Sequence, residues 1–128
     1  MTTTVHSRGP SIAAMFAALD AGDAEAAFGY FAEDITLTFG NAPAAHGKAE
    51  VAVALGELVG KLSAIRHDIT GLWDFPGKPN VVVAEMKVTY STPDGRETTV
   101  PCCNVLELRD RQVTGFRIYT DLGPVFPQ

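Results

Sequence analysis

Apolar residues recur along the first part of the chain with the spacing of helices. A first helix is predicted to open at Pro10 and Ser11 and to end at Gly22, because apolar side chains three and four positions apart form one stripe. That stripe is Ile12, Met15, Phe16 and Leu19. Asp23 suits the N-cap of a second helix, whose apolar face continues through Phe28 to Phe31. Residues 1–9 lack apolar periodicity and are expected to form a disordered N-terminus.

The pattern then changes to alternation. Residues 35–39 alternate apolar residues with threonine and predict a short strand, followed by a loop over residues 40–47. A third helix is predicted over residues 48–62, although Gly56 and Gly60 weaken it. Strands are predicted over residues 65–73, 81–90, 98–108 and 113–120, with a turn made by Pro76, Gly77, Pro79 and Asn80.

The order of the elements indicates the fold class. Helices come first, and the last four strands follow one another through short turns, which favours an antiparallel meander packed on helices. The sequence therefore predicts an α+β fold, with residues 10–128 forming a single domain.

Composition narrows the classes of partner. The chain has 128 residues, with 10 Lys and Arg against 15 Asp and Glu, so nucleic acid and anionic membrane surfaces are not expected to bind it. No apolar run is long enough to span a bilayer, and residues 1–10 do not look like a secretory signal. Cys102 and Cys103 point to opposite faces of a strand, which favours reduced thiols in a cytoplasmic protein.

Strand alternation identifies the residues that face the interior. Val82, Ala84, Met86, Val88 and Tyr90 share one face, and Phe116, Ile118 and Thr120 share another. Asn104 is the polar exception in the row of Cys102, Leu106 and Leu108. Its amide either satisfies a backbone group within the core or meets a ligand in a cavity, and both readings stay open.

Other polar residues are weaker candidates. His67 alternates in phase with Ile65 and Ile69, so it faces inward either as a core histidine or as a catalytic base. Tyr90 ends the inward row of its strand and could present its hydroxyl to a ligand. His46 is expected at the surface, and the scattered histidines form no metal motif.

Several segments, taken together in order and spacing, resemble the nuclear transport factor 2-like superfamily, in its SnoaL-like and ketosteroid isomerase-like branch. They are Leu19-Asp-Ala-Gly-Asp23, residues 30–36, His46-Gly47 and residues 115–121. The resemblance implies a cystatin-like fold: a curved antiparallel or mixed sheet wrapped around three N-terminal helices, forming a cone with an apolar pocket. It also implies a homodimer through the outer sheet face, where Arg117, Tyr119 and Thr99 would be buried.

The resemblance permits a residue-by-residue comparison of catalytic positions. The aspartate base of ketosteroid isomerases falls on Phe39, their oxyanion tyrosine on Met15, and their oxyanion aspartate on Asn104. The aspartate of limonene epoxide hydrolases falls on Ile118. For the aspartate and histidine of SnoaL-like cyclases, Asp121 and His67 are the candidates.

Two functions that use the pocket follow as expectations, beside a third reading as a pure interaction domain that dimerises through its outer sheet. One is an isomerase, cyclase or dehydratase acting on an apolar carbonyl compound without metal or other cofactor, with Asn104, His67 and Tyr90 as catalytic residues. The other is a non-catalytic domain that binds a lipophilic small molecule. In both, the pocket lining is expected to be Met15, Phe39, Met86, Val88, Phe116, Ile118 and Thr120.

Overall fold

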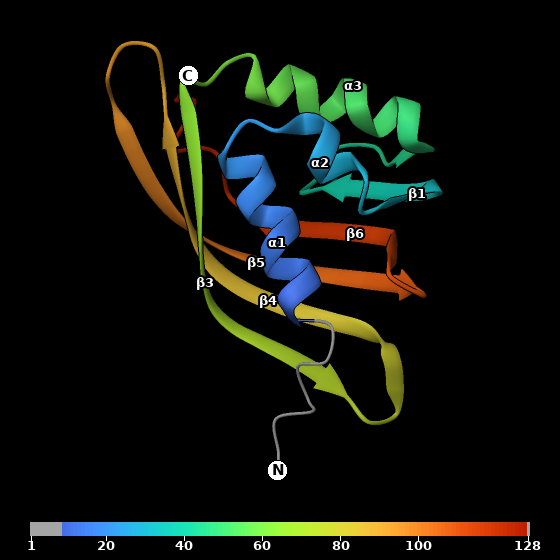
Figure 1. The fold of residues 1–128 in the computed structure, drawn as a ribbon. Coiled ribbons are helices and arrows are strands. Elements are labelled where there is room, and N and C mark those ends of the chain that lie inside the picture. Colours follow the sequence, from blue (N-terminus) through green and yellow to red (C-terminus); the bar gives the residue numbers. More distant parts are fainter. Residues whose placement is uncertain (1–8, 128) are drawn as a thin grey trace.

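A strongly curved sheet with helices on its concave side forms the protein (Figure 1). The computed structural model describes residues 9–127. The helices are α1 (Gly9–Asp20), α2 (Ala24–Phe28) and α3 (Lys48–Val59). The strands are β1 (Phe31–Phe39), β2 (Ala45–His46), β3 (Ala64–Phe75), β4 (Lys78–Ser91), β5 (Glu97–Arg109) and β6 (Gln112–Thr120). This is the predicted α+β class, with a curved mixed sheet.

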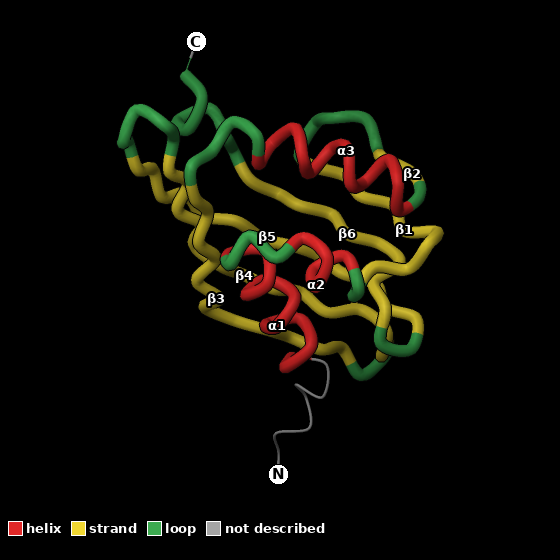
Figure 2. Tube along the Cα trace, turned by 45° about the horizontal axis from the view of Figure 1, so that its top comes forward, coloured by secondary structure: helices red, strands yellow, loops and turns green. Residues whose placement is uncertain are grey.

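The sheet has six strands in the order β2-β1-β6-β5-β4-β3. Strands β3 to β6 form the predicted antiparallel meander, and β1 joins β6 in parallel. Helix α1 packs against β3, while α3 lies along β1 and β2 at the opposite edge (Figure 2). The space between these two helices faces the middle of the concave sheet.

The inner faces of the strands follow the predicted alternation. Val82, Ala84, Met86, Val88 and Tyr90 are buried on β4, as are Cys102, Asn104, Leu106 and Leu108 on β5. Ile12, Met15 and Phe16 of α1 complete this core from above. The ring of Phe16 meets that of Phe116 edge-on, with centroids 6.0 Å apart, so α1 is held over the centre of the sheet.

Five of the predicted boundaries differ from those in the structure. Helix α2 ends at Phe28, and Phe31 begins β1 instead of extending the helix, because the Tyr30 carbonyl accepts a hydrogen bond from the backbone N–H of Val113 in β6. Ala45–His46 is a short strand within the expected loop, paired with Thr36 and Leu37. The disordered N-terminus was expected over residues 1–9. Residues 1–8 lie outside the described residues, and Gly9 is the first residue of α1.

The other two corrections concern α3 and the β3–β4 hairpin. Helix α3 ends at Val59 and not at Leu62, because Gly60 caps it. Pro79 and Asn80 belong to β4, since Lys78 already pairs with Phe75 and a register shift follows. Two residues, Pro76 and Gly77, are therefore left for the turn.

A bulge between Ile69 and Gly71 bends β3. A Cβ at Gly71 would lie 2.3 Å from Cη2 of the Trp73 side chain, which covers this position on the outer face. The outer face also carries Tyr119, which is 55% exposed, and an ion pair in which Arg117 Nη1 lies 2.6 Å from Glu107 Oε2. The homodimer expected through this face stays a prediction.

Candidate functional site

An apolar cavity of about 60 Å³ lies between α1, α3 and the concave face of the sheet. Helix α1 contributes Phe16 and Leu19, and α3 contributes Leu55, Leu58 and Val59. The sheet side is made by Phe39, Ile65, His67, Val88, Tyr90, Cys102, Asn104, Phe116 and Ile118. His67, Asn104 and Tyr90, the three predicted catalytic residues, therefore line one cavity.

His67 is held by a carboxylate at the end of α1. Its Nδ1 lies 2.6 Å from Asp20 Oδ1, and its backbone N–H donates to both carboxylate oxygens of Asp20, at 3.1 and 3.0 Å. An ionised carboxylate only accepts hydrogen bonds, which assigns the proton to Nδ1 and leaves the lone pair on Nε2. The Phe16 ring, 4.8 Å away between centroids, fixes the imidazole from the other side.

The electrostatics of this pair favour a neutral imidazole. Burial lowers the pKa of His67 below its ordinary value of 6.5, while the hydrogen bond and the charge of Asp20 oppose that shift. Asp20 is the last residue of α1, where the helix dipole disfavours a negative charge. The hydrogen bonds from His67 compensate for this unfavourable position, so Asp20 and His67 form a unit.

Asn104 presents an amide to the cavity from the middle of β5. It is 1% exposed, and within residues 9–127 the hydrogen-bond partners of its side chain are sulfur atoms. Its Nδ2 donates to Met86 Sδ at 3.4 Å, and Cys102 Sγ donates to its Oδ1 at 3.7 Å. Sulfur is a weak hydrogen-bond partner, so these contacts orient the amide and leave much of its bonding capacity for a ligand.

Tyr90 and Cys102 are the remaining titratable groups at the cavity wall. Burial and the neighbouring Cys102 sulfur raise the pKa of Tyr90 well above its ordinary value of 10.0, so its hydroxyl remains a donor. Burial also raises the pKa of the Cys102 thiol to about 11, which keeps it protonated at neutral pH. Neither group therefore suits the role of a base near neutral pH.

The predicted pocket lining is found only in part at this cavity. Phe39, Val88, Phe116 and Ile118 line it. Met15 and Met86 are instead buried in the core, because Met15 lies on the buried face of α1 and Met86 lies behind the Asn104 amide. Thr120 is also not a wall residue: its hydroxyl donates to the Pro101 carbonyl at 2.8 Å, at the end of the strand.

The other candidates lie away from the cavity. His46 is exposed, and its backbone N–H donates to the Glu50 side chain at 2.9 Å. Asp121 is exposed and accepts a hydrogen bond from the backbone N–H of Gly123 at 2.8 Å, which is a turn contact.

Phe39 and Ile118, by contrast, line the cavity, and they present apolar side chains at the positions where the resemblance sets carboxylates.

Asp20 is the residue that sequence reasoning missed. It lies in the segment Leu19-Asp-Ala-Gly-Asp23, but its spacing from His67, 47 positions, gave no local signal. The one available indication was a negatively charged side chain at the C-terminal end of a predicted helix. The helix dipole makes a negative charge unfavourable there, so a hydrogen-bond partner is expected.

Within residues 9–127, no cluster of three or more His, Cys, Asp or Glu side chains has the arrangement of a metal site. None of the described helices has the length and apolar character needed to cross a membrane.

Comparison with known proteins gives the family. The family model of the SnoaL-like domain matches residues 12–116. No curated protein matches the sequence.

Solved structures share the fold at low identity. A candidate SnoaL-like polyketide cyclase from Jannaschia sp. is 16% identical with a TM-score of 0.81, over 98% of this chain and 92% of that one. A protein of ketosteroid isomerase-like fold from Catenulispora acidiphila, in complex with trimethylamine, is 18% identical with a TM-score of 0.80, over 92% and 90% of the two chains. An LEH-like epoxide hydrolase from M. tuberculosis is 17% identical with a TM-score of 0.78, over 94% of this chain and 86% of that one. With the family model matching most of its length, the chain belongs to the SnoaL-like domain family.

Proposed function

We propose that the protein is an enzyme that uses acid–base chemistry on an apolar carbonyl compound, as an isomerase, cyclase or dehydratase. One observation carries this proposal: a half-buried histidine held by Asp20, an under-bonded amide and a tyrosine hydroxyl line the same apolar cavity. Perturbed titratable groups that meet in a mostly apolar pocket are typical of active sites.

The chemistry begins with removal of a proton from the carbon next to the carbonyl. Nε2 of neutral His67 accepts that proton, and the electron pair of the C–H bond moves onto the carbonyl oxygen to form an enolate. The Asn104 amide N–H and the Tyr90 O–H donate to the oxygen as its charge develops. Both donors are neutral and buried, so the enolate meets fixed dipoles rather than water.

Asp20 acts through His67. Its carboxylate holds Nδ1–H, so Nε2 is the free nitrogen, and it stabilises the imidazolium formed when the proton is taken. The proton then returns to a different carbon in an isomerase. In a cyclase the enolate carbon attacks a second carbonyl, and the resulting alkoxide takes the proton from the His67 imidazolium. In a dehydratase the enolate expels the β-hydroxyl, which takes the same proton and leaves as water. The choice among these three depends on the substrate.

Exchange of protons next to a carbonyl tests the shared first step. Unbranched 2-alkanones and cyclic ketones are incubated with the protein in D₂O, and deuterium uptake is followed by mass spectrometry. We expect His67→Gln and Asn104→Leu each to reduce exchange by about 10²-fold or more. The control is Tyr119→Phe on the outer face, which should leave exchange unchanged while Tyr90→Phe reduces it. Exchange by the unaltered protein at the rate of free imidazole would contradict the proposal.

A non-catalytic binding protein is the second candidate. Phe39 and Ile118 favour it, because apolar side chains stand where relatives are expected to carry carboxylates. A binding protein would differ from an enzyme in two measurements. Ketones would raise its melting temperature, but no bound ketone would exchange deuterium.

A further inference from the structure

The cavity is too small for the compounds that the proposed chemistry needs. Its volume is about 60 Å³. A cavity of about 150 Å³ is needed to hold benzene, and small-molecule sites are usually about 300–1,000 Å³. The cavity therefore accommodates a carbonyl group and its nearest carbons, and the rest of a substrate must lie elsewhere.

A larger groove adjoins the cavity. It has a volume of about 310 Å³ and lies between α3, β1 and the C-terminal segment 121–127. Phe39, Leu55 and Leu58 line both the cavity and the groove, so these side chains are the partition between them. The remaining groove residues are Leu37, Ala42, Ala54, Glu57, Lys61, Leu122 and Phe126. Joined, the two spaces reach the usual range for a ligand site.

The α3 side of the partition is loosely packed. Val51 is the buried residue of α3, whereas Val53 and Val59 are 63% and 50% exposed. Two further hollows, of about 120 and 210 Å³, border Val59. At Gly56 a Cβ would meet nothing within 4 Å, so this glycine serves no close contact and simply makes the helix easier to deform. Leu55 and Leu58 therefore lie on the weakly packed side of the partition.

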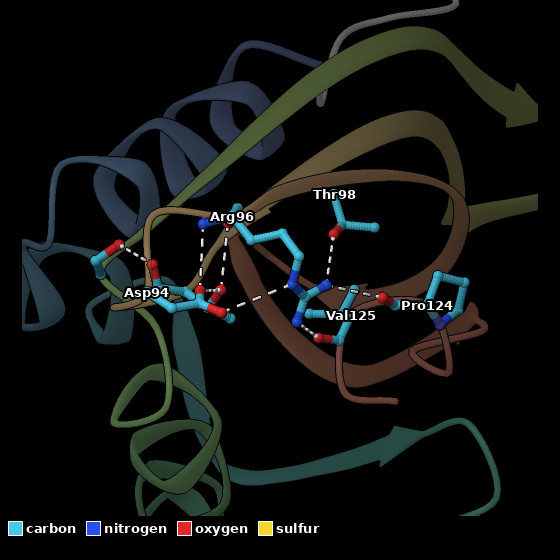
Figure 3. A network of polar contacts seen from close by, with 7 residues as sticks. Asp94, Arg96, Thr98, Pro124 and Val125 are labelled. Atoms are coloured by element: carbon cyan, nitrogen blue, oxygen red, sulfur yellow. Dashed lines mark hydrogen bonds and ion pairs between the residues drawn. The ribbon is translucent and has the colours of Figure 1, made fainter. Parts of the chain in front are cut away.

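The opposite wall of the groove is fixed by Arg96 (Figure 3). Its guanidinium donates to the carbonyl of Pro124 at 3.2 Å and to that of Val125 at 2.8 Å, which ties the C-terminal segment to the β4–β5 hairpin. Val125 is fully buried as an anchor. With this wall held, a ligand that spans both spaces has to displace Leu55, Leu58 or Phe39.

We infer that the groove is the second half of the binding site and that the substrate is an elongated, unbranched apolar carbonyl compound. Its carbonyl lies in the cavity, and its chain passes between Leu55, Leu58 and Phe39 into the groove. The chain end is apolar, because apart from Lys61 and Glu57, whose charges are opposite, the groove is lined by apolar side chains. This inference rests on the proposed function for the position of the carbonyl.

Binding of 2-alkanones from four to twelve carbons, measured by isothermal titration calorimetry, tests the inference. Each added carbon should increase affinity about two- to fourfold until the groove is filled, the upper figure being complete burial of a methylene. Ala54→Phe fills the groove without touching the cavity and should remove this gain for long ketones while leaving short ones unchanged. The matched control is Val53→Phe, which adds the same side chain at an exposed neighbouring position. Ala42→Phe repeats the test at an exposed groove position, where the larger side chain displaces no buried residue.

A second variant pair tests the movement of α3. Gly56→Ala stiffens the helix without a clash, so it should stabilise the protein and slow association of long ketones several-fold. Gly77→Ala, which also meets nothing within 4 Å but lies in the β3–β4 turn, should leave association unchanged.

The outcomes separate this inference from the proposed function. If short ketones bind and exchange deuterium but affinity does not rise with length, or Ala54→Phe and Val53→Phe behave alike, the groove is not part of the site and the proposed function stands. If no ketone in the series binds, both are overturned.

Discussion

Replacing Asn104 with leucine should stabilise the protein while removing its activity. The amide is 1% exposed and has sulfur atoms as its partners, at 3.4 and 3.7 Å. An incompletely bonded buried amide costs about 1–3 kcal/mol, and leucine at the same place buries apolar surface instead. The adjoining cavity takes up the larger side chain. We therefore expect Asn104→Leu to increase the free energy of unfolding by about 1–2 kcal/mol.

Urea unfolding and thermal melts measure this change. For a chain of this length, 1 kcal/mol corresponds to about 4 °C, so the melting temperature should rise by about 4–8 °C. Met86→Leu is the control: it removes the sulfur acceptor, keeps the volume, and should change stability by less than about 1.5 kcal/mol. A loss of more than 1 kcal/mol in Asn104→Leu would show that the amide is a structural element of the core, and the reasoning would fail.

Three further predictions use other groups. The pKa of His67 in the folded protein lies below 6.5, so the unfolded chain binds the proton first as the pH falls. The contribution of His67 to the free energy of unfolding is therefore fully present above pH 6.5 and decreases below it. In urea titrations, His67→Gln should make this decrease smaller. With a thiol pKa of about 11, Cys102 should react with iodoacetamide at pH 8 at least about tenfold more slowly than half-buried Cys103, measured by mass spectrometry on the two single Cys→Ser variants. Arg96→Met should release the C-terminal segment and speed hydrogen exchange at the amides of Val125 and Phe126 about tenfold, with unchanged exchange in α1 as the control.

Strand alternation was sufficient to predict the inner face of the sheet. A side chain on β4 or β5 must point to one face or the other, so the apolar rows ending at Tyr90 and Leu108 could be assigned from the sequence. The same argument brought His67 and Asn104 to the concave side. Alternation could not predict which inward-facing side chains reach the cavity surface. Met15 and Met86 face inward, yet they are covered by other side chains and do not line the cavity.

Tertiary contacts decided the remaining features. Phe31 suits a helix face or a strand equally by its apolar character, and pairing with Val113 of β6 selected the strand. The partner of His67 could not be found because the Asp20–His67 contact is created by packing α1 across the sheet. The small size of the cavity depends on the position of α3, which local sequence does not determine.

The most direct test of the central claim is a crystal structure with a long-chain 2-alkanone bound. We expect the carbonyl oxygen within about 3 Å of Asn104 Nδ2 and the Tyr90 hydroxyl, and the adjacent carbon facing Nε2 of His67. A ketone bound with its carbonyl away from Asn104 and His67, or a cavity that stays closed at saturating ligand, would contradict that claim.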